Sequence, residues 1–100
     1  MRYHGIDIPQ DKIAAFCGRH AVKRLSLYGS VLHDGFGPDS DVDVLVEFLP
    51  GRTPGMFGFG QMILELGEII GREVDLRTPE DLSEYFRDDV LRKAKPLHAA

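Results

Sequence analysis

The sequence predicts a small α/β (α+β) domain in which a mixed sheet of about three to four strands is flanked by helices. Two observations support this prediction. Segments with apolar residues at three- and four-residue steps alternate along the chain with short runs rich in valine and leucine. The 100 residues are 43% hydrophobic, which is enough for one core, and no long linker divides them. We therefore expect residues 1–100 to form a single domain.

The first half of the chain is expected to form one helix and two strands. Residues 9–20 open with Pro9, which favours the first turn of a helix, and then carry apolar residues at helical spacing. Residues 24–28 form a short strand that Gly29 ends, and a helical turn or loop follows it. A longer strand, rich in valine, covers residues 40–48 (SDVDVLVEF).

The second half is expected to add a long helix, a third strand and a helical end. After a loop rich in proline and glycine, apolar residues recur at helical spacing over residues 59–70, and Gly71 is a natural helix stop. Residues 72–78 (REVDLRT) are typical of a strand. Thr78 then caps the next helical segment, and two short helices, or one helix broken near Arg87, finish the chain.

Charge and cysteine content narrow the class of protein. The formal net charge of −4 argues against direct binding of nucleic acid, which needs clustered lysine and arginine. A single cysteine cannot form an internal disulfide, and the first residues lack the apolar region of a secretory signal, so we expect a cytoplasmic location. No segment approaches the length needed to span a membrane, so no membrane partner is expected.

Three aspartates lie within the predicted strands. Successive side chains of a strand face opposite sides, so Asp41 and Asp43 lie on one face while the valines of the same strand form the core. Asp75 has the equivalent position in the third strand, between Val74 and Leu76. If the two strands are neighbours, three carboxylates share one surface, where a hard cation such as Mg²⁺ or Mn²⁺ would relieve their repulsion. Such a site suits the clamping of a polyphosphate during phosphoryl transfer.

A Gly-Ser pair at the end of the first strand supplies the complementary half of such a site. Gly29 permits a tight turn with close backbone approach, and the N–H and hydroxyl of Ser30 are suited to hold a phosphate. Taken alone the pair is a weak signal, and an Asp-x-Asp sequence on a strand is often only a solvated edge. The interpretation rests on the spacing: Gly29-Ser30, ten residues, Asp41-x-Asp43, and Asp75 beyond a helix.

In this spacing the sequence resembles the nucleotidyltransferases of the DNA polymerase β superfamily. It is most similar to the minimal nucleotidyltransferase (MNT) domains that serve as antitoxins beside HEPN-domain toxins. The resemblance rests on "GS", ten residues, "DVD", the continuation "VLVEF" and the later "VDL", and it covers roughly residues 10–97. It implies a polymerase β-like fold and transfer of AMP from ATP, with Mg²⁺, to an acceptor hydroxyl.

The resemblance also implies a role for each residue of the motif. Gly29 and Ser30 would hold the triphosphate. Asp41 and Asp43 would ligate the metal ions, and Asp75 would help bind the catalytic metal and assist deprotonation of the attacking hydroxyl.

In one respect the sequence departs from the family pattern. Many relatives place an arginine just after the Gly-Ser pair, whereas residues 31–33 are Val-Leu-His here. This departure lowers the expected affinity for phosphate and does not change the expected metal site. Other residues remain alternatives: Glu47 and Glu73 share the strand parity of the aspartates, His33 is within reach of a phosphate, and Arg52 lies in a loop that could close over substrate.

Because larger members of the superfamily carry a further domain that binds the acceptor, we expect another molecule to bring the acceptor here. The resemblance points to a tyrosine of a cognate HEPN ribonuclease toxin, which AMP would neutralise. Two alternatives stay open: a non-catalytic antitoxin that neutralises its partner by binding, and a nucleotidyltransferase that acts on RNA or a small molecule.

Overall fold

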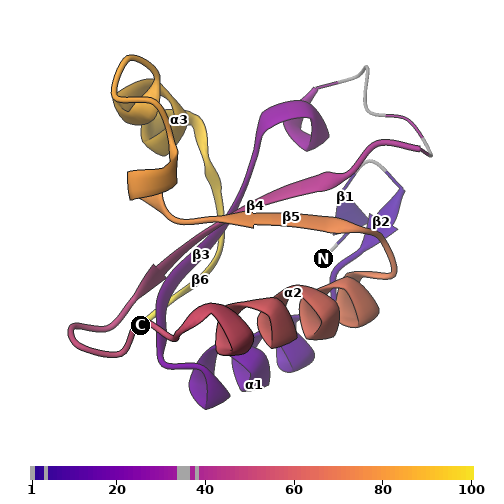
Figure 1. Cartoon of the computed structure of the whole chain (residues 1–100). Helices are drawn as coiled ribbons and strands as arrows, with labels where there is room; N and C mark the ends of the chain where they lie inside the picture. Colours follow the sequence, from indigo (N-terminus) through magenta and orange to yellow (C-terminus); the bar gives the residue numbers. More distant parts are fainter. Residues whose placement is uncertain (1, 4, 34–36, 38) are drawn as a thin grey trace.

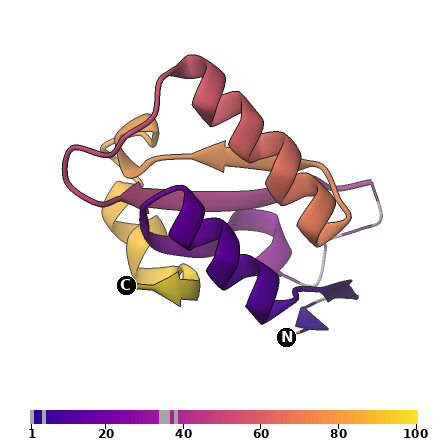
Figure 2. The ribbon, with the colours of Figure 1, turned by 90° about the horizontal axis from the view of Figure 1, so that it is seen from below.

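The structure is a computed structural model that describes residues 2–3, 5–33, 37 and 39–100. Its centre is a four-stranded sheet in the order β5-β4-β3-β6, with two helices lying across one face (Figures 1 and 2). The helices are α1 (Gln10–Arg19), α2 (Met56–Ile70) and α3 (Arg87–Lys93), and the strands of the sheet are β3 (Val22–Tyr28), β4 (Val42–Phe48), β5 (Val74–Arg77) and β6 (Lys95–Ala99). Two 3-10 turns, η1 (Gly29–Leu32) and η2 (Pro79–Asp81), and a hairpin of β1 (Arg2–Tyr3) with β2 (Ile6–Asp7) complete the elements. The predicted mixed sheet flanked by helices is confirmed.

The pairing of the strands is mixed. The inner strand β3 runs antiparallel to both β4 and β6, while β4 and β5 are parallel and are joined by the crossover helix α2. The parallel register sets Val42 opposite Val74 and Asp43 opposite Asp75. The strand that carries the third carboxylate is therefore the direct neighbour of the strand that carries the first two.

The core lies between the sheet and the two long helices. Val42, Val44 and Val46 have no exposed surface, which confirms the predicted valine face of β4. Each fully buried side chain of this size favours folding by about 1.5–3 kcal/mol. The helices contribute two rows of buried residues, Ile13, Phe16 and Cys17 from α1 and Met62, Leu66 and Ile70 from α2.

The helices begin and end close to where the sequence predicts. Helix α1 follows Pro9, and α2 ends at Gly71, whose φ of 78° is left-handed and whose N–H donates to the carbonyl oxygen of Gly67 at 2.7 Å. Thr78 and Asp81 form the capping box that the acidic first turn predicts, although the turn it opens, η2, has only three residues.

The last strand is a correction to the prediction that helices finish the chain. Residues 95–99 (KPLHA) pair with β3 as β6, although their sequence has a proline and little alternation. β6 is an edge strand, the position in a sheet where proline is tolerated. The ladder also shifts register between Leu25 and Ser26, an irregularity that sequence periodicity does not reveal. The hairpin of β1 and β2 was likewise not predicted, because each strand has only two residues.

The opposite face of the sheet is only partly covered. Figure 1 shows the segment from η2 to α3 standing on this face, away from α1 and α2. Leu45 and Ser26, which are register partners, are buried there, while Asp43 remains half-buried. Within the described residues, no helix has the length and apolar character needed to cross a membrane.

Candidate active site

Three neighbouring strands bring polar side chains into one row across the partly covered face. Tyr28 of β3 is the register partner of Asp43 in β4, and Asp43 is the register partner of Asp75 in β5. Register partners share a face of the sheet, so the three side chains lie side by side. Asp41, two residues before Asp43, is exposed and lies just outside β4.

Gly29 turns the chain tightly beside this row. It has a left-handed φ of +74°, and a Cβ added to it would lie 2.5 Å from Oδ2 of Asp43. A side chain at position 29 would force this carboxylate to move, so the group that needs the close approach is an aspartate of the site itself. The next residue, Ser30, is exposed and forms a backbone hydrogen bond with Asp43. Gly29, Ser30 and Asp43 thus form one local unit.

The row carries crowded negative charge. Burial raises the pKa of Asp43 above its ordinary value of 3.8, and repulsion from Asp75 and Asp41 adds to this effect, while the Ser30 hydrogen bond and Arg77 oppose it. Burial and the nearby carboxylates also raise the pKa of Tyr28 to about 12, so its phenol stays protonated at neutral pH. Both groups therefore resist taking a negative charge, first because they are buried and second because other carboxylates lie nearby.

Arg77 is the basic residue that partners the third carboxylate. Its Nε donates to Oδ1 of Asp75 at 3.2 Å and its Nη2 donates to Oδ2 at 3.3 Å. The two residues are two positions apart on β5, so their side chains share a face. Asp75 is therefore held by an internal cation.

The donor set fits a hard divalent metal in its chemistry. Asp41 and Asp43 offer oxygen ligands, as Mg²⁺ and Mn²⁺ prefer, and a bound cation would offset the burial and, after it, the neighbouring carboxylates that raise the pKa of Asp43. In the part of the chain that the structure describes, no three acidic, histidine or cysteine side chains converge on one point. Asp41, just before β4, and Asp43, within it, are thus the carboxylates available to a metal. Asp75 is hydrogen-bonded to Arg77.

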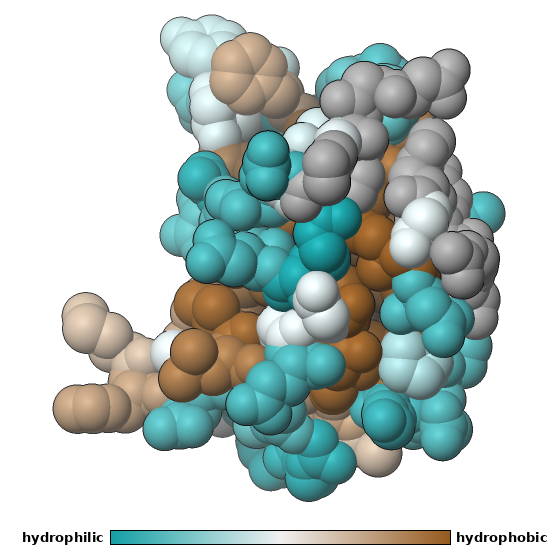
Figure 3. Space-filling model, turned by 90° about the vertical axis from the view of Figure 1, so that its right-hand side faces the viewer, coloured by the Kyte–Doolittle hydropathy of each residue, from teal (hydrophilic) through white to brown (hydrophobic). Residues whose placement is uncertain are grey.

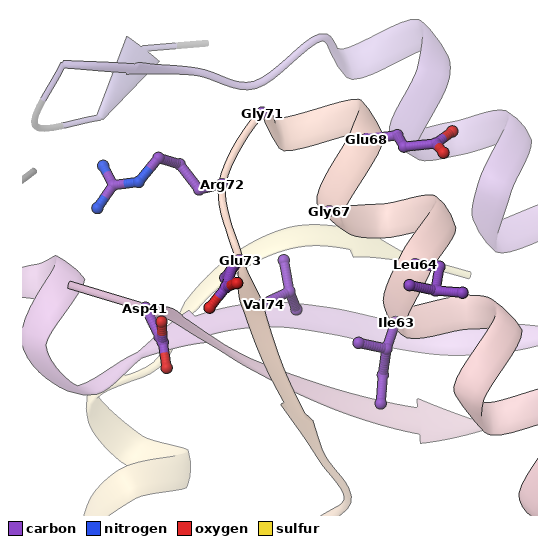
Figure 4. Close-up of a pocket in the computed structure, with 9 residues that line it drawn as sticks. All are labelled: Asp41, Ile63, Leu64, Gly67, Glu68, Gly71, Arg72, Glu73 and Val74. Atoms are coloured by element: carbon purple, nitrogen blue, oxygen red, sulfur yellow. The ribbon is translucent and has the colours of Figure 1, made fainter. Parts of the chain in front are cut away.

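Two hollows flank the carboxylates. One, of about 530 Å³, lies between α2 and the edge of β5, and Figure 4 shows Asp41 and Glu73 at one side of it and Ile63 and Leu64 at the other. A second, of about 280 Å³, lies between Gly29 and α3 and is lined by both apolar and charged side chains. Figure 3 looks on the end of the sheet where β4 begins and shows hydrophilic residues above and below a more hydrophobic middle part.

The loop that leads to Asp41 is tied to the connection between α2 and β5. Nη2 of Arg72 donates to the carbonyl oxygens of Gly37, at 2.9 Å, and of Ser40. The N–H of Val42 donates to the carbonyl oxygen of Glu73 at 2.9 Å. These bonds fix the backbone on both sides of Asp41, although residues 34–36 and 38 of the ten-residue spacer lie outside the described residues.

The structure brings together the residues on which the sequence interpretation depends. Gly29, Ser30, Asp41, Asp43 and Asp75 lie around the strand ends of β3, β4 and β5. Of the alternatives, Glu73 lies beside Asp41 in the larger hollow, and His33 lines the smaller one. Glu47 lies further along β4 in a different hollow, and Arg52 is exposed in the loop after that strand.

Sequence reasoning missed three residues that shape the site: Tyr28, Arg72 and Arg77. Tyr28 directly precedes the Gly-Ser pair, and Arg77 has the same strand parity as Asp75. The sequence could therefore have predicted that both side chains lie near the aspartates. Arg72 acts on a loop more than thirty residues away in sequence, and no local pattern predicts such a contact.

A first prediction follows from the raised pKa of Asp43. The native carboxyl holds its proton to a higher pH than the unfolded chain does, so metal-free stability falls as pH rises above 3.8 through the native pKa, and it stays lowered at neutral pH. Asp43→Asn removes this charge. In the presence of a chelator we expect the variant to melt a few degrees above the wild type at neutral pH.

The melting temperatures of both proteins measured from pH 3 to pH 8 would test this. The gain should vanish near the acid end, where the wild-type carboxyl is protonated. A variant that melts below the wild type at every pH would contradict the prediction.

The comparison with protein families gives one match over most of the chain. The family described as "Nucleotidyltransferase domain" matches residues 11–97. Two proteins of Methanocaldococcus jannaschii, both provisionally named protein adenylyltransferases, are 34% and 31% identical to this chain. The first comparison covers 83% of this chain and 87% of the relative, and the second covers 68% of each.

Solved structures share the fold. A structure provisionally titled a minimal nucleotidyltransferase matches with a TM-score of 0.71 at 33% identity, covering 87% of each chain. A chain of a toxin–antitoxin complex with AMP-PNP matches with a TM-score of 0.70 at 20% identity, covering 93% of this chain and 75% of that one. A chain from the complex of a tri-AMPylated Shewanella oneidensis HEPN toxin with an MNT antitoxin matches with a TM-score of 0.62 at 20% identity, covering 91% and 70%. These matches confirm the predicted minimal nucleotidyltransferase fold.

Proposed function

Because this chain belongs to the nucleotidyltransferase domain family and is an MNT-type enzyme, we propose that it is an antitoxin that transfers AMP from ATP to a tyrosine of a HEPN ribonuclease toxin. The observation that supports this most directly is the register pair of Asp43 and Asp75, with Asp41 at the start of the same strand and Gly29-Ser30 alongside. The names of the curated relatives support protein as the acceptor, and the complexes that share the fold support a HEPN partner and an ATP-like ligand.

The proposed roles follow from position. Gly29 and Ser30 hold the triphosphate at the end of β3, where the backbone is tightly turned and the Ser30 side chain is exposed. Asp41 and Asp43 ligate the divalent metal. When bound, Mg²⁺ supplies charge neutralisation of the phosphates and orientation of the leaving group.

In the proposed reaction the acceptor hydroxyl oxygen bonds to the α-phosphorus, the bond from that phosphorus to the bridging oxygen breaks, and pyrophosphate leaves. The hydroxyl proton passes toward Asp75, the carboxylate beside Asp43. Tyr28 keeps its own proton, since its pKa is about 12, and so does not compete as a base at neutral pH. The AMP group adds negative charge to the toxin, which would repel RNA from its active site.

Intact-mass spectrometry tests the proposal. A candidate HEPN protein, sought among the genes next to that of this chain, is incubated with the purified protein, Mg²⁺ and ATP, and its mass should rise by whole AMP units. Peptide mapping should place the added group on a tyrosine. A toxin that is inhibited but unmodified would contradict the transferase and leave neutralisation by binding, whereas AMP found on RNA or a small molecule would replace the protein acceptor.

A further inference from the structure

The carboxylate that the proposed reaction needs for metal and proton is already occupied. Arg77 approaches Asp75 side-on, with Nε at 3.2 Å from Oδ1 and Nη2 at 3.3 Å from Oδ2. Both oxygens of the carboxylate therefore accept from one guanidinium, the fork geometry that makes arginine a strong partner for carboxylates. A metal ion bound by Asp75 would have to compete with this guanidinium for the same two carboxylate oxygens.

The contact between Arg77 and Asp75 follows from their positions on the same strand. Asp75 and Arg77 are two residues apart on the edge strand β5 and face the same side. Their register partners are Asp43 and Leu45, so Arg77 lies two residues along the strand from the acidic row, and its guanidinium reaches back to Asp75. The field of Arg77 also reaches Asp43, where it opposes the rise in pKa.

The ion pair between Arg77 and Asp75 is exposed to solvent. The Asp75 side chain is 39% exposed and the Arg77 side chain is 48% exposed. Ion pairs of such exposure contribute little net free energy, because water and salt screen them. A divalent cation that enters beside Asp41 and Asp43 meets a competitor that can be displaced.

We propose that Arg77 is the resident counter-cation of Asp75, and that a divalent metal gains Asp75 as a ligand only by displacing the Arg77 guanidinium. The inference rests on the proposed function in taking Asp41, Asp43 and Asp75 as the metal carboxylates. Arg77 is then a positioning residue that holds the third carboxylate in place and lowers the affinity of the empty enzyme for metal.

Metal binding by the nucleotide-free protein tests this without any catalysis. Mn²⁺ is titrated into wild type and Arg77→Gln, and free Mn²⁺ is read by electron paramagnetic resonance. We expect the variant to bind Mn²⁺ about two- to fivefold more tightly, the range that matches loss of an exposed ion pair. Arg77→Lys should also gain affinity, by less, since it keeps the charge but loses the two-point contact.

Two controls separate displacement from a general change in charge. Arg19→Gln removes an arginine that is also ion-paired with an acid, Glu65, but in the helical layer on the other face of the sheet. It should leave Mn²⁺ affinity unchanged. The second control repeats Arg77→Gln in an Asp75→Asn background, where Arg77 and the metal no longer share a carboxylate, so the gain should shrink to the small effect that the charge of Arg77 has on Asp43. Circular dichroism melts confirm that each variant is folded.

Several outcomes would overturn the inference: equal Mn²⁺ affinity in wild type and Arg77→Gln, an unchanged gain in the Asp75→Asn background, or no Mn²⁺ binding by any variant. A loss of affinity in Arg77→Lys equal to that in Asp75→Asn would also do so. None of these results depends on ATP or a toxin, so the transferase proposal is tested separately by the mass of the toxin.

Discussion

Asp41→Asn combined with Asp43→Asn is expected to abolish AMP transfer, by about 10³-fold or more, while the protein stays folded. The two carboxylates supply the negative charge that would hold a divalent ion, and the electrostatic stabilisation lost with that ion amounts to several kcal/mol. Asparagine is close in size but neutral. The core-facing neighbours Val42 and Val44 are untouched, so the hydrophobic layer is retained.

The measurement is single-turnover transfer of AMP to the toxin, followed by intact mass. A matched control is Asp7→Asn combined with Asp11→Asn, which removes two exposed aspartates from β2 and α1, neither of which carries a residue of the row. The control should transfer AMP at the wild-type rate. Transfer by the site variant within tenfold of wild type would contradict the role of both aspartates. Toxin neutralised equally by both variants, with no AMP added, would point to binding alone.

The sequence allowed the carboxylate-bearing face of the sheet to be predicted because side chains alternate strictly between the two faces of a strand. Alternation placed Asp43 opposite the valines, and the same parity placed Asp75 opposite Val74 and Leu76. One condition remained, that the two strands be neighbours, and the parallel pairing of β4 with β5 fulfils it. The helix boundaries were predictable for a similar reason, since Pro9 and Gly71 act through local backbone geometry.

What could not be predicted depends on contacts between distant segments. β6 is a strand because β3 offers it an unpaired edge, and the sequence of residues 95–99 does not favour that state by itself. The link from Arg72 to the Asp41 loop is of the same kind. The close approach at Gly29 was expected, but for a phosphate. The group that requires it in the structure is Asp43, which lies fourteen residues later in the chain.

Gly29→Ala adds one methyl group beside Asp43 and is therefore expected to lower the rate of AMP transfer by about 10²-fold. The added Cβ would lie 2.5 Å from Oδ2 of Asp43, too close for any stable contact. The short Asp43 side chain must rotate or shift to relieve it, and displacement of a catalytic group by about 1 Å can cost about 10²-fold in rate. Alanine at a φ of +74° also adds a backbone penalty of about 1–2 kcal/mol to the free energy of folding.

The two effects can be separated because the chain offers a second glycine with the same conformation. Gly51 has a φ of +73° and no atom within 4 Å of an added Cβ. Gly51→Ala should therefore lower the free energy of unfolding by a similar amount, measured by urea denaturation, yet leave AMP transfer unchanged under conditions where the protein is folded. If Gly29→Ala lost no more activity than Gly51→Ala, Asp43 would not need its observed position, and the assignment of Asp43 as a metal ligand would fall with it.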